Sequence, residues 1–380
     1  MTPRGVLYVS SIPGDGYGDA AVGMIAALEH LGIPVTWTPL TWGRSGLVRT
    51  ASNLGPYREL AGRRIKYDTV ILHLPPPAYW EFRPECRGRR VIALTTWETD
   101  RLPSDWSPIL DGVDALIVPS TFNRDAFATS GVRTPVHVVP HAVRNRASGE
   151  RPHLPVGDRF VFYTIAPWST RKAIEETITA YLDAFAGRED VALVVKTSEY
   201  DLKALLRARR REPHAPTGKD VQPWWTLAHL LANRHAPPLV HLIAANVSLG
   251  EIDGIHERGD CFVSLTRAEG FGLNVFDAAL ARNPVIVTGW GGHLDYLGRD
   301  YPLLVDYDLA RMDADPDDAW LAMVAEHHWA VADHDDAVDK LRWVDDHRDG
   351  AAAIGAQLAP KLSTEYSVAA VAKRLAVALR

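Results

Sequence analysis

The segment AEGFGLNVFDAALARNPVIVTGWGG, residues 268–292, contains a glycine-rich turn, an apolar helix pattern, a buried strand and a second glycine turn in succession. The apolar run CFVSLT (261–266) precedes it, and PLLVDY (302–307) follows it. Continuous apolar strands separated by helices are typical of a parallel sheet that is covered on both faces. We therefore predict a doubly wound α/β sheet in this part of the chain.

The same alternation occurs twice along the chain. In the first half we predict strands at 6–12, 35–40, 68–74, 90–96, 114–120 and 136–141, with a helix over about 19–31. In the second half we predict strands at 160–166, 191–197, 239–245, 261–266, 284–289 and 302–307, with a helix over about 172–186. The polar segment between them, 143–159, is rich in Arg, Gly and Pro, as interdomain linkers are.

A chain of 380 residues is long for a single core. We predict a Rossmann-like domain over residues 1–150, a second over 151–362, and a C-terminal helix over 363–380 that could return to the first domain. Doubly wound sheets bind ligands at the carboxyl ends of their strands. The fold class is therefore α/β, with two Rossmann-like domains facing a cleft, where we expect the chemistry.

Composition excludes several functional classes. The net charge is −6 and the apolar fraction is 47%, which does not favour a nucleic-acid partner. The two cysteines, Cys86 and Cys261, have no metal-binding or disulfide spacing, so a reducing compartment is expected. No signal peptide and no membrane-spanning segment are predicted. We therefore expect a cytoplasmic protein.

Acidic and glycine residues alternate at the start of the predicted helix in 268–292. Gly270 and Gly272 allow a positive φ and a close approach of backbone to ligand. The amides of Phe271, Gly272 and Leu273 are expected to begin the helix, and an uncapped helix N-terminus binds phosphate oxygens. Glu269 and Asp277 could bind hydroxyl groups nearby; the structural alternative is that both acids merely favour the helix dipole.

Around this motif, RAEGFGLNVFDAALARNPVIVTGWGGHLDYL (267–297) resembles the signature of retaining GT-B glycosyltransferases of the group-1, GT4-type family. The two acids of that signature stand eight positions apart, as Glu269 and Asp277 do. APWSTRKAIEETITAYLDAF (166–185) is similar to the family's basic helix start, and IPGDGYGDAAVGMIAALEHLG (12–32) to its first glycine loop. Asp277 departs from the more usual Glu, and Pro167 stands where an Arg is usual.

The resemblance implies a metal-independent transferase that moves a sugar from a nucleotide-diphosphate sugar to a hydroxyl of a small-molecule or glycan acceptor. The first domain would then face the acceptor and the second would bind the donor, with no further cofactor. Glu269 would bind the sugar, Asp277 the ribose, and Lys172 the diphosphate. Arg171 could replace the arginine lost at 167. We expect Arg171 and Lys172 to open the helix over 172–186, opposing its dipole.

The first domain offers further candidates. The turn GDGYG (14–18) follows the first strand but fails the GxGxxG pattern, so Gly16, Tyr17 and Gly18 are assigned to donor contact or to a plain turn. By resemblance, Glu98 in TTWETD (95–100) lies where relatives place a catalytic residue. His73 and His141 remain alternatives for this role.

Other interpretations stay open. A nucleotide-sugar-binding pseudoenzyme and a GT-B sugar-nucleotide epimerase would have the same architecture. The basic run RARRR (207–211) could support a peripheral membrane contact, and the oligomeric state is not predicted. DYD (306–308) and DAD (313–315) resemble a metal-binding DxD motif but follow both sheets, and EHH (326–328) is interpreted as part of a surface helix.

Overall fold

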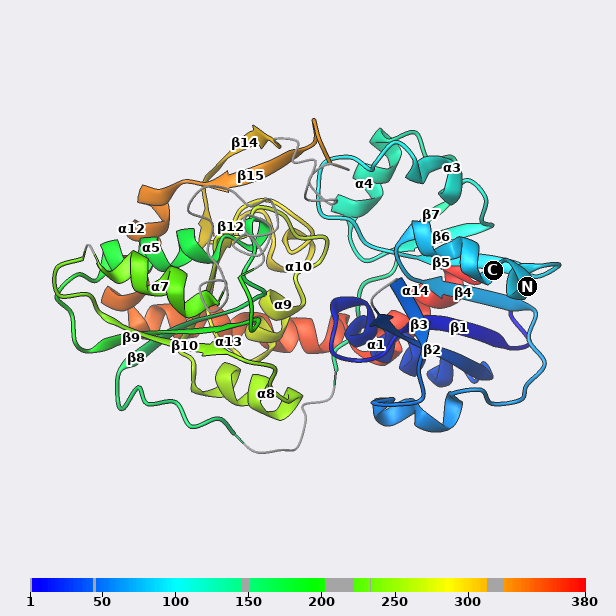
Figure 1. Cartoon of the computed structure of the whole chain (residues 1–380), viewed down its shortest axis with the longest axis horizontal. Coiled ribbons are helices and arrows are strands. Elements are labelled where there is room, and N and C mark those ends of the chain that lie inside the picture. Colours follow the sequence, from blue (N-terminus) through cyan, green and yellow to red (C-terminus); the bar gives the residue numbers. More distant parts are fainter. Residues whose placement is uncertain (1, 44–45, 145–150, 202–221, 233, 313–323) are drawn as a thin grey trace. The chain divides into compact units, whose positions relative to one another are not determined.

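The computed structural model describes residues 2–43, 46–144, 151–201, 222–232, 234–312 and 324–380 (Figure 1). The chain divides into two compact units. Unit 1 comprises Met1–Asn145 together with Leu362–Arg380, and unit 2 comprises Arg146–Lys361.

Unit 1 contains a seven-stranded sheet of order β3-β2-β1-β4-β5-β6-β7. Its strands are β1 (Val6–Ser11), β2 (Val35–Gly43), β3 (Gly46–Arg49), β4 (Thr69–His73), β5 (Arg90–Leu94), β6 (Ala115–Val118) and β7 (Val136–Val138). All neighbours are parallel except β2 and β3, which form a hairpin. The sequence did not predict β3, because GLVR is too short to show an apolar run or an alternation.

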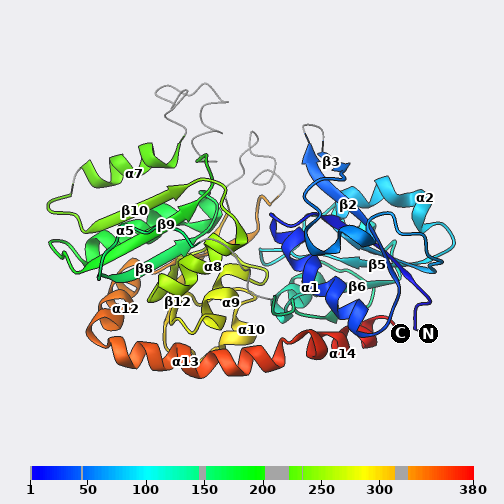
Figure 2. The same ribbon diagram turned by 90° about the horizontal axis from the view of Figure 1, so that it is seen from below.

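Helices cover the sheet of unit 1. In chain order they are α1 (Gly16–His30), η1 (Gly55–Leu60), η2 (Pro76–Phe82), α2 (Arg83–Cys86), α3 (Trp106–Leu110), α4 (Thr121–Thr129) and α14 (Val368–Ala378). The last of these comes from the far end of the chain and lies beside α1 (Figures 1 and 2). Val371 and Leu375 of α14 are buried in the same core as Met24 and Ile25 of α1.

Unit 2 contains a six-stranded parallel sheet of order β10-β9-β8-β11-β12-β13 and a separate antiparallel pair, β14 with β15. The strands are β8 (Phe160–Ile165), β9 (Val191–Thr197), β10 (Leu239–Ala244), β11 (Cys261–Ser264), β12 (Val285–Thr288), β13 (Leu304–Val305), β14 (Tyr307–Arg311) and β15 (His328–Ala332). The helices are η3 (Thr170–Lys172), α5 (Ile174–Ala184), α7 (Pro223–Ala232), α8 (Leu249–Arg258), α9 (Leu273–Leu280), α10 (Leu294–Leu297), α12 (His334–Asp346) and α13 (Arg348–Glu365).

Successive residues of β8 show how this sheet is covered on both faces. Phe162 contacts Tyr181 of α5, whereas the next residue, Tyr163, contacts His256 of α8. Because neighbouring side chains of a strand point to opposite faces, α5 and α8 lie on opposite sides of the sheet. Asn283, just after α9, donates to the Tyr163 hydroxyl at 2.7 Å, which places this end of α9 on the α8 side.

Two predictions about local structure need correction. EHH is not part of a surface helix, since His327 is buried and His328 begins β15. The helix expected from residue 172 begins at Ile174, after a separate 3-10 turn. The basic run 207–211 and the DAD motif at 313–315 lie outside the described residues.

Both sheets reverse their strand order at one position. In unit 1 the reversal lies between β1 and β4, and in unit 2 it lies between β8 and β11. At such a point the loops that leave the two adjacent strands diverge and open a crevice at the carboxyl edge. These carboxyl edges are therefore the expected positions of the candidate residues.

Candidate functional site

Two loops meet at the carboxyl edge of unit 2. The loop after β8 carries Arg171 and Lys172, and the loop after β11 carries Glu269. The Arg267 amide donates to the Arg171 carbonyl at 2.8 Å, and the Arg171 guanidinium donates to the Ala268 carbonyl at 2.8 Å. These reciprocal bonds hold the basic loop against the acidic one.

Glu269 is the centre of this arrangement. Its Oε1 accepts a hydrogen bond from Lys172 Nζ at 2.5 Å, and its Oε2 lies 3.7 Å from Arg171 Nη1. Its side chain is only 11% exposed. Burial raises the pKa of the Glu269 carboxyl, but the positive charges of Lys172 and Arg171 outweigh burial and hold that pKa below its ordinary value. The carboxyl is therefore ionised at neutral pH.

Arg171 and Lys172 do not open α5, contrary to the sequence prediction. They lie in the 3-10 turn η3, and Ala173 then adopts a left-handed conformation with φ of 50° before α5 begins. The first turn of α5 instead carries Glu175 and Glu176, which suit a helix N-terminus. The side chains of the two cations contact Glu269.

Helix α9 starts at Leu273, after the turn that follows Glu269. Gly272 is its N-cap, with φ of 81°, and no side chain among the described residues caps it by a hydrogen bond. The first backbone bond of the helix runs from the Phe276 amide to the Gly272 carbonyl. The amides of Leu273 and its two successors therefore lie in the helix's first turn, where they can serve an external acceptor.

Phe271 precedes α9 instead of belonging to it. Its ring is buried and packs against Phe276 and Tyr296 at centroid distances of 5.2 Å. The Tyr296 hydroxyl donates to the Gly272 carbonyl at 3.0 Å, so this aromatic cluster supports the turn Gly270–Gly272. Asp277 lies in the second turn of α9 and is partly exposed. It is one turn beyond Leu273 on the same side of the helix.

The structure adds His293, which the sequence analysis did not single out. His293 follows the GWGG turn and is fully buried, and its Nε2 hydrogen donates to the Thr288 carbonyl at 2.8 Å. Burial lowers the pKa of the imidazole, so the ring is neutral near pH 7. Its Nδ1 has no hydrogen-bond partner among the described residues. No pattern in the sequence could separate it from an ordinary turn histidine.

Lys196, at the end of β9, is a second residue that the sequence analysis missed. It pairs in register with Ile165 of β8, whose carbonyl accepts a hydrogen bond from Asn274 in the first turn of α9 at 2.8 Å. Lys196 Nζ donates to the Thr197 carbonyl at 3.3 Å and forms no ion pair within the described part of the chain. Burial lowers its pKa. Lys196 therefore lies on the strand next to the one that contacts the first turn of α9.

Gly16, Tyr17 and Gly18 form the start of α1 in unit 1. A Cβ at Gly18 would lie 1.8 Å from the Ile12 carbonyl oxygen, whereas a Cβ at Gly16 would meet no atom within 4 Å. Gly18 is thus required for packing of α1 on the preceding loop. The Tyr17 hydroxyl lies 3.0 Å from Thr95 Oγ1, which links α1 to the loop after β5.

Glu98 lies in that same loop, and its side chain is partly exposed. Buried Asn123 of α4 holds the loop, since its Oδ1 accepts from the Trp97 amide at 2.9 Å and its Nδ2 donates to the Trp97 carbonyl at 2.7 Å. Burial raises the pKa of Tyr17, and the negative charge of Glu98 raises it further. Glu98 and Tyr17 are therefore neighbours at this edge.

His73 and His141 are both buried in unit 1. The Tyr8 hydroxyl and His73 Nδ1 are 2.7 Å apart. Burial lowers the pKa of His73 well below its ordinary value, with a smaller contribution from His141, and burial lowers the pKa of His141 to about 4. Both rings are neutral near pH 7.

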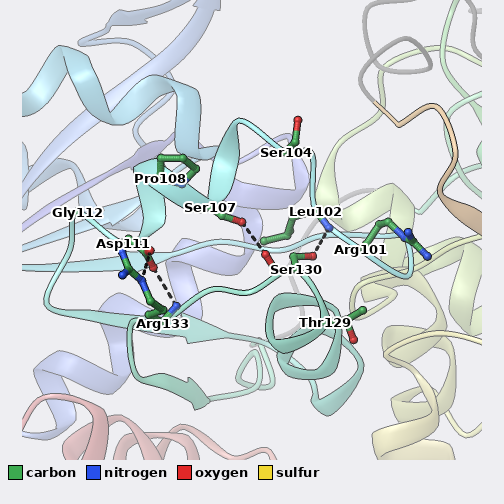
Figure 3. A pocket seen from close by; sticks show the side chains of 10 residues that line it. All are labelled: Arg101, Leu102, Ser104, Ser107, Pro108, Asp111, Gly112, Thr129, Ser130 and Arg133. Atoms are coloured by element: carbon green, nitrogen blue, oxygen red, sulfur yellow. Dashed lines mark hydrogen bonds and ion pairs between the residues drawn. The ribbon is translucent and has the colours of Figure 1, made fainter.

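A pocket of about 760 Å³ lies elsewhere in unit 1, beside α3 and α4 (Figure 3). Residues that line the pocket interact with one another. Ser107 Oγ donates to the Ser130 carbonyl at 3.0 Å, and Arg133 Nε lies 2.8 Å from Asp111 Oδ2. None of the candidate residues of either unit lines it. Shape alone therefore does not locate the chemistry.

Among the residues that the structure describes, no group of three or more His, Cys, Asp or Glu side chains is placed to hold a metal ion. No described helix combines the length and the apolar composition needed to cross a membrane.

Comparison with solved structures identifies the fold. The chain is similar to an E. coli trehalose-6-phosphate structure bound with UDP-2-fluoro glucose, with 13% identity, a TM-score of 0.62 and 98% coverage of both chains. It is similar to sucrose-phosphate synthase from Thermosynechococcus elongatus, with 13% identity, a TM-score of 0.63, and coverage of 98% of this chain and 97% of that one. It is also similar to Anabaena HepE in complex with UDP, with 13% identity, a TM-score of 0.60 and 99% coverage of both chains.

No protein-family model matches the chain, and no curated protein sequence is significantly similar to it. At identities this low, the structural likeness concerns the fold. It confirms the predicted fold class, an α/β chain with parallel sheets and the GT-B architecture of glycosyltransferases.

Proposed function

We propose that the chain is a retaining, metal-independent glycosyltransferase of the GT4 type, which moves a sugar from a nucleotide-diphosphate sugar to an acceptor hydroxyl. The observation that carries this proposal is the placement of Glu269. A buried, ionised carboxylate contacts Lys172 and Arg171 and precedes the turn that leads to a helix start without a side-chain cap. A carboxylate that accepts hydrogen bonds, two cations and a set of amide donors together suit a ligand in which a sugar is joined to a diphosphate.

Each group of the site has a role in this proposal. Glu269 accepts hydrogen bonds from the sugar hydroxyls, and Lys172 with Arg171 stabilises the charge that develops on the departing diphosphate. The first-turn amides of α9 bind phosphate oxygens. Asp277, one turn further along α9, accepts from the ribose hydroxyls. Lys196 supplies a positive charge near α9, which compensates for the proline at position 167, where an arginine is usual.

The ligands of two similar structures support the choice of donor. One of them contains UDP and another UDP-2-fluoro glucose. In retaining transfer the leaving phosphate can itself accept the proton of the attacking hydroxyl, so a separate protein base is not required. The cations and the α9 amides provide the charge stabilisation, which is why we propose that no metal ion is needed.

A thermal-shift screen against UDP, GDP, ADP and TDP sugars tests donor binding. A ligand at about a hundredfold its Kd should add about 2.7 kcal/mol to the unfolding free energy. With the donor identified, turnover is measured in EDTA, and the anomeric configuration of the product is determined by NMR. Binding without any release of nucleotide would indicate a pseudoenzyme, and no response to any nucleotide sugar would exclude the proposal.

A further inference from the structure

The hairpin of β2 and β3 presents an exposed tryptophan at the carboxyl edge of unit 1. Trp42 lies at the end of β2 and is 59% exposed. Its indole Nε1 donates to Asp15 Oδ2 at 3.1 Å, which fixes the ring although most of its surface is open. An exposed aromatic ring that is already held in one orientation loses little conformational entropy when a ligand stacks on it.

Asp15 connects this ring to the candidate residues of α1. It is the N-cap of α1, and its Oδ1 accepts from the Gly18 amide at 2.8 Å and from Ser11 Oγ at 2.7 Å. Among the described residues, Oδ2 accepts only from Trp42, and a carboxylate oxygen can accept a second hydrogen bond. A hydroxyl-bearing ligand on the indole face would therefore find a charged acceptor at the edge of the ring.

We propose that Trp42 and Asp15 form a subsite for a saccharide acceptor, an inference that rests on the proposed transferase function. A pyranose ring has one face of C–H groups and a rim of hydroxyls. The C–H face packs on the indole, and a rim hydroxyl donates to Asp15 Oδ2. The fixed carboxylate also disfavours an anionic lipid surface as the occupant, because like charges repel.

A second exposed tryptophan in unit 1 provides a matched control. Trp80 of η2 is 52% exposed, but the Arg83 guanidinium lies 3.6 Å from the centroid of its ring. One face of Trp80 is therefore already covered by a cation, and its indole forms no hydrogen bond with any residue that the structure describes. Exposure is nearly equal in the two residues, whereas a fixed and open ring face belongs to Trp42.

Saccharide binding can be measured without any nucleotide. Saturation-transfer NMR with pooled methyl pyranosides, maltose and cellobiose should detect binding to the native protein and loss of about tenfold or more in affinity in Trp42→Ala. Trp42→Phe, which keeps a ring but loses the bond to Asp15, should be intermediate, and Trp80→Ala should bind as the native protein does. UDP affinity, measured by calorimetry, should be equal in all four proteins.

The outcomes separate this inference from the proposed function. If UDP binds but no saccharide does, or if Trp80→Ala loses saccharide binding as fully as Trp42→Ala, the subsite is wrong while the transferase proposal stands. Vesicles of phosphatidylglycerol serve as a further arm, because vesicle binding that depends on Trp42 would overturn the saccharide assignment. Saccharide binding that is lost in Trp42→Ala while the protein binds no nucleotide would overturn the acceptor role, because a transferase acceptor site requires a donor site.

Discussion

Among single residues, Glu269 should affect both stability and turnover, because its carboxylate pairs with Lys172. Glu269→Gln removes the charge that neutralises two part-buried cations, so we expect the free energy of unfolding to fall by about 1–3 kcal/mol. Turnover should fall by about a hundredfold or more, since a group positioned for the transition state is lost. Chemical denaturation and steady-state kinetics measure the two effects.

Exposed Glu189 is the matched control, since Glu189→Gln in the same unit should change neither quantity. Native turnover in Glu269→Gln would remove the carboxylate from the mechanism. A loss of stability without loss of turnover would assign Glu269 a purely structural role.

The buried imidazole of His141 predicts how stability depends on pH. Its pKa is about 4 in the folded protein, because burial disfavours the charged ring. In the unfolded chain the ring takes a proton near pH 6.5. Between pH 6.5 and 4 the unfolded chain therefore binds more protons at this ring than the folded protein does. The contribution of neutral His141 to the free energy of unfolding is complete above pH 6.5 and is lost as the pH falls towards 4. The loss for this group amounts to about 3 kcal/mol.

Denaturation curves between pH 7.5 and 4 test this prediction. His141→Gln, which cannot take a proton, should show a smaller loss of stability over that range than the native protein. His73 shifts in the same direction, so a residual slope should remain in the variant. An unchanged slope in His141→Gln would contradict the assignment.

At the scale of an element, the start of α1 depends on one of its two glycines. A Cβ at Gly18 would collide with the Ile12 carbonyl, and the helix cannot move away without breaking its contacts with β1. Gly18→Ala should therefore lower the free energy of unfolding by about 3 kcal/mol. Gly16→Ala, where a Cβ meets open space, is the control and should change stability by less than about 0.5 kcal/mol.

These two variants also bear on function. Gly16, Tyr17 and Gly18 are expected to contact the donor or to form a plain turn, and of the two glycines Gly16 alone has space for a Cβ. If Gly16→Ala folds normally but loses donor affinity, the loop contacts the ligand as proposed. Native affinity in a folded Gly16→Ala variant would make this loop a plain turn.

At the scale of the whole molecule, unit 1 is completed by the end of the chain. Val371, Leu375 and Leu379 are buried in its core, and the Arg90 guanidinium donates to the Leu379 carbonyl. Each such aliphatic side chain contributes about 1.5–3 kcal/mol when it is buried. Removing residues 368–380 therefore takes away stabilisation comparable with a domain's entire free energy of unfolding, about 5–15 kcal/mol.

We expect the truncated protein to lose hydrogen-exchange protection across β1, β4 and α1 while the strands of unit 2 keep theirs. Val377→Ala is the control in the same helix, since Val377 is 59% exposed. Full protection of unit 1 in the truncated protein would show that α14 is dispensable.

By itself, the sequence determined the features that depend on neighbours along the chain. Apolar runs separated by helix patterns predicted both sheets, and two glycines predicted the turn before α9, in which Gly272 adopts the expected positive φ, 81°, and Gly270 does not. Glu269 could be named because it stands next to that turn. In these cases the physical cause, burial of a strand or freedom of φ, acts within a few residues.

The tertiary structure alone decided which distant groups meet. Lys172 and Glu269 are 97 positions apart and pair because strands β8 and β11 are neighbours in the sheet. The 3-10 turn that aims Lys172, the buried ring of His293 and the cation of Lys196 likewise depend on the order and register of the strands. Sheet order follows from long-range packing, which no local pattern encodes, and it brought these side chains to one edge.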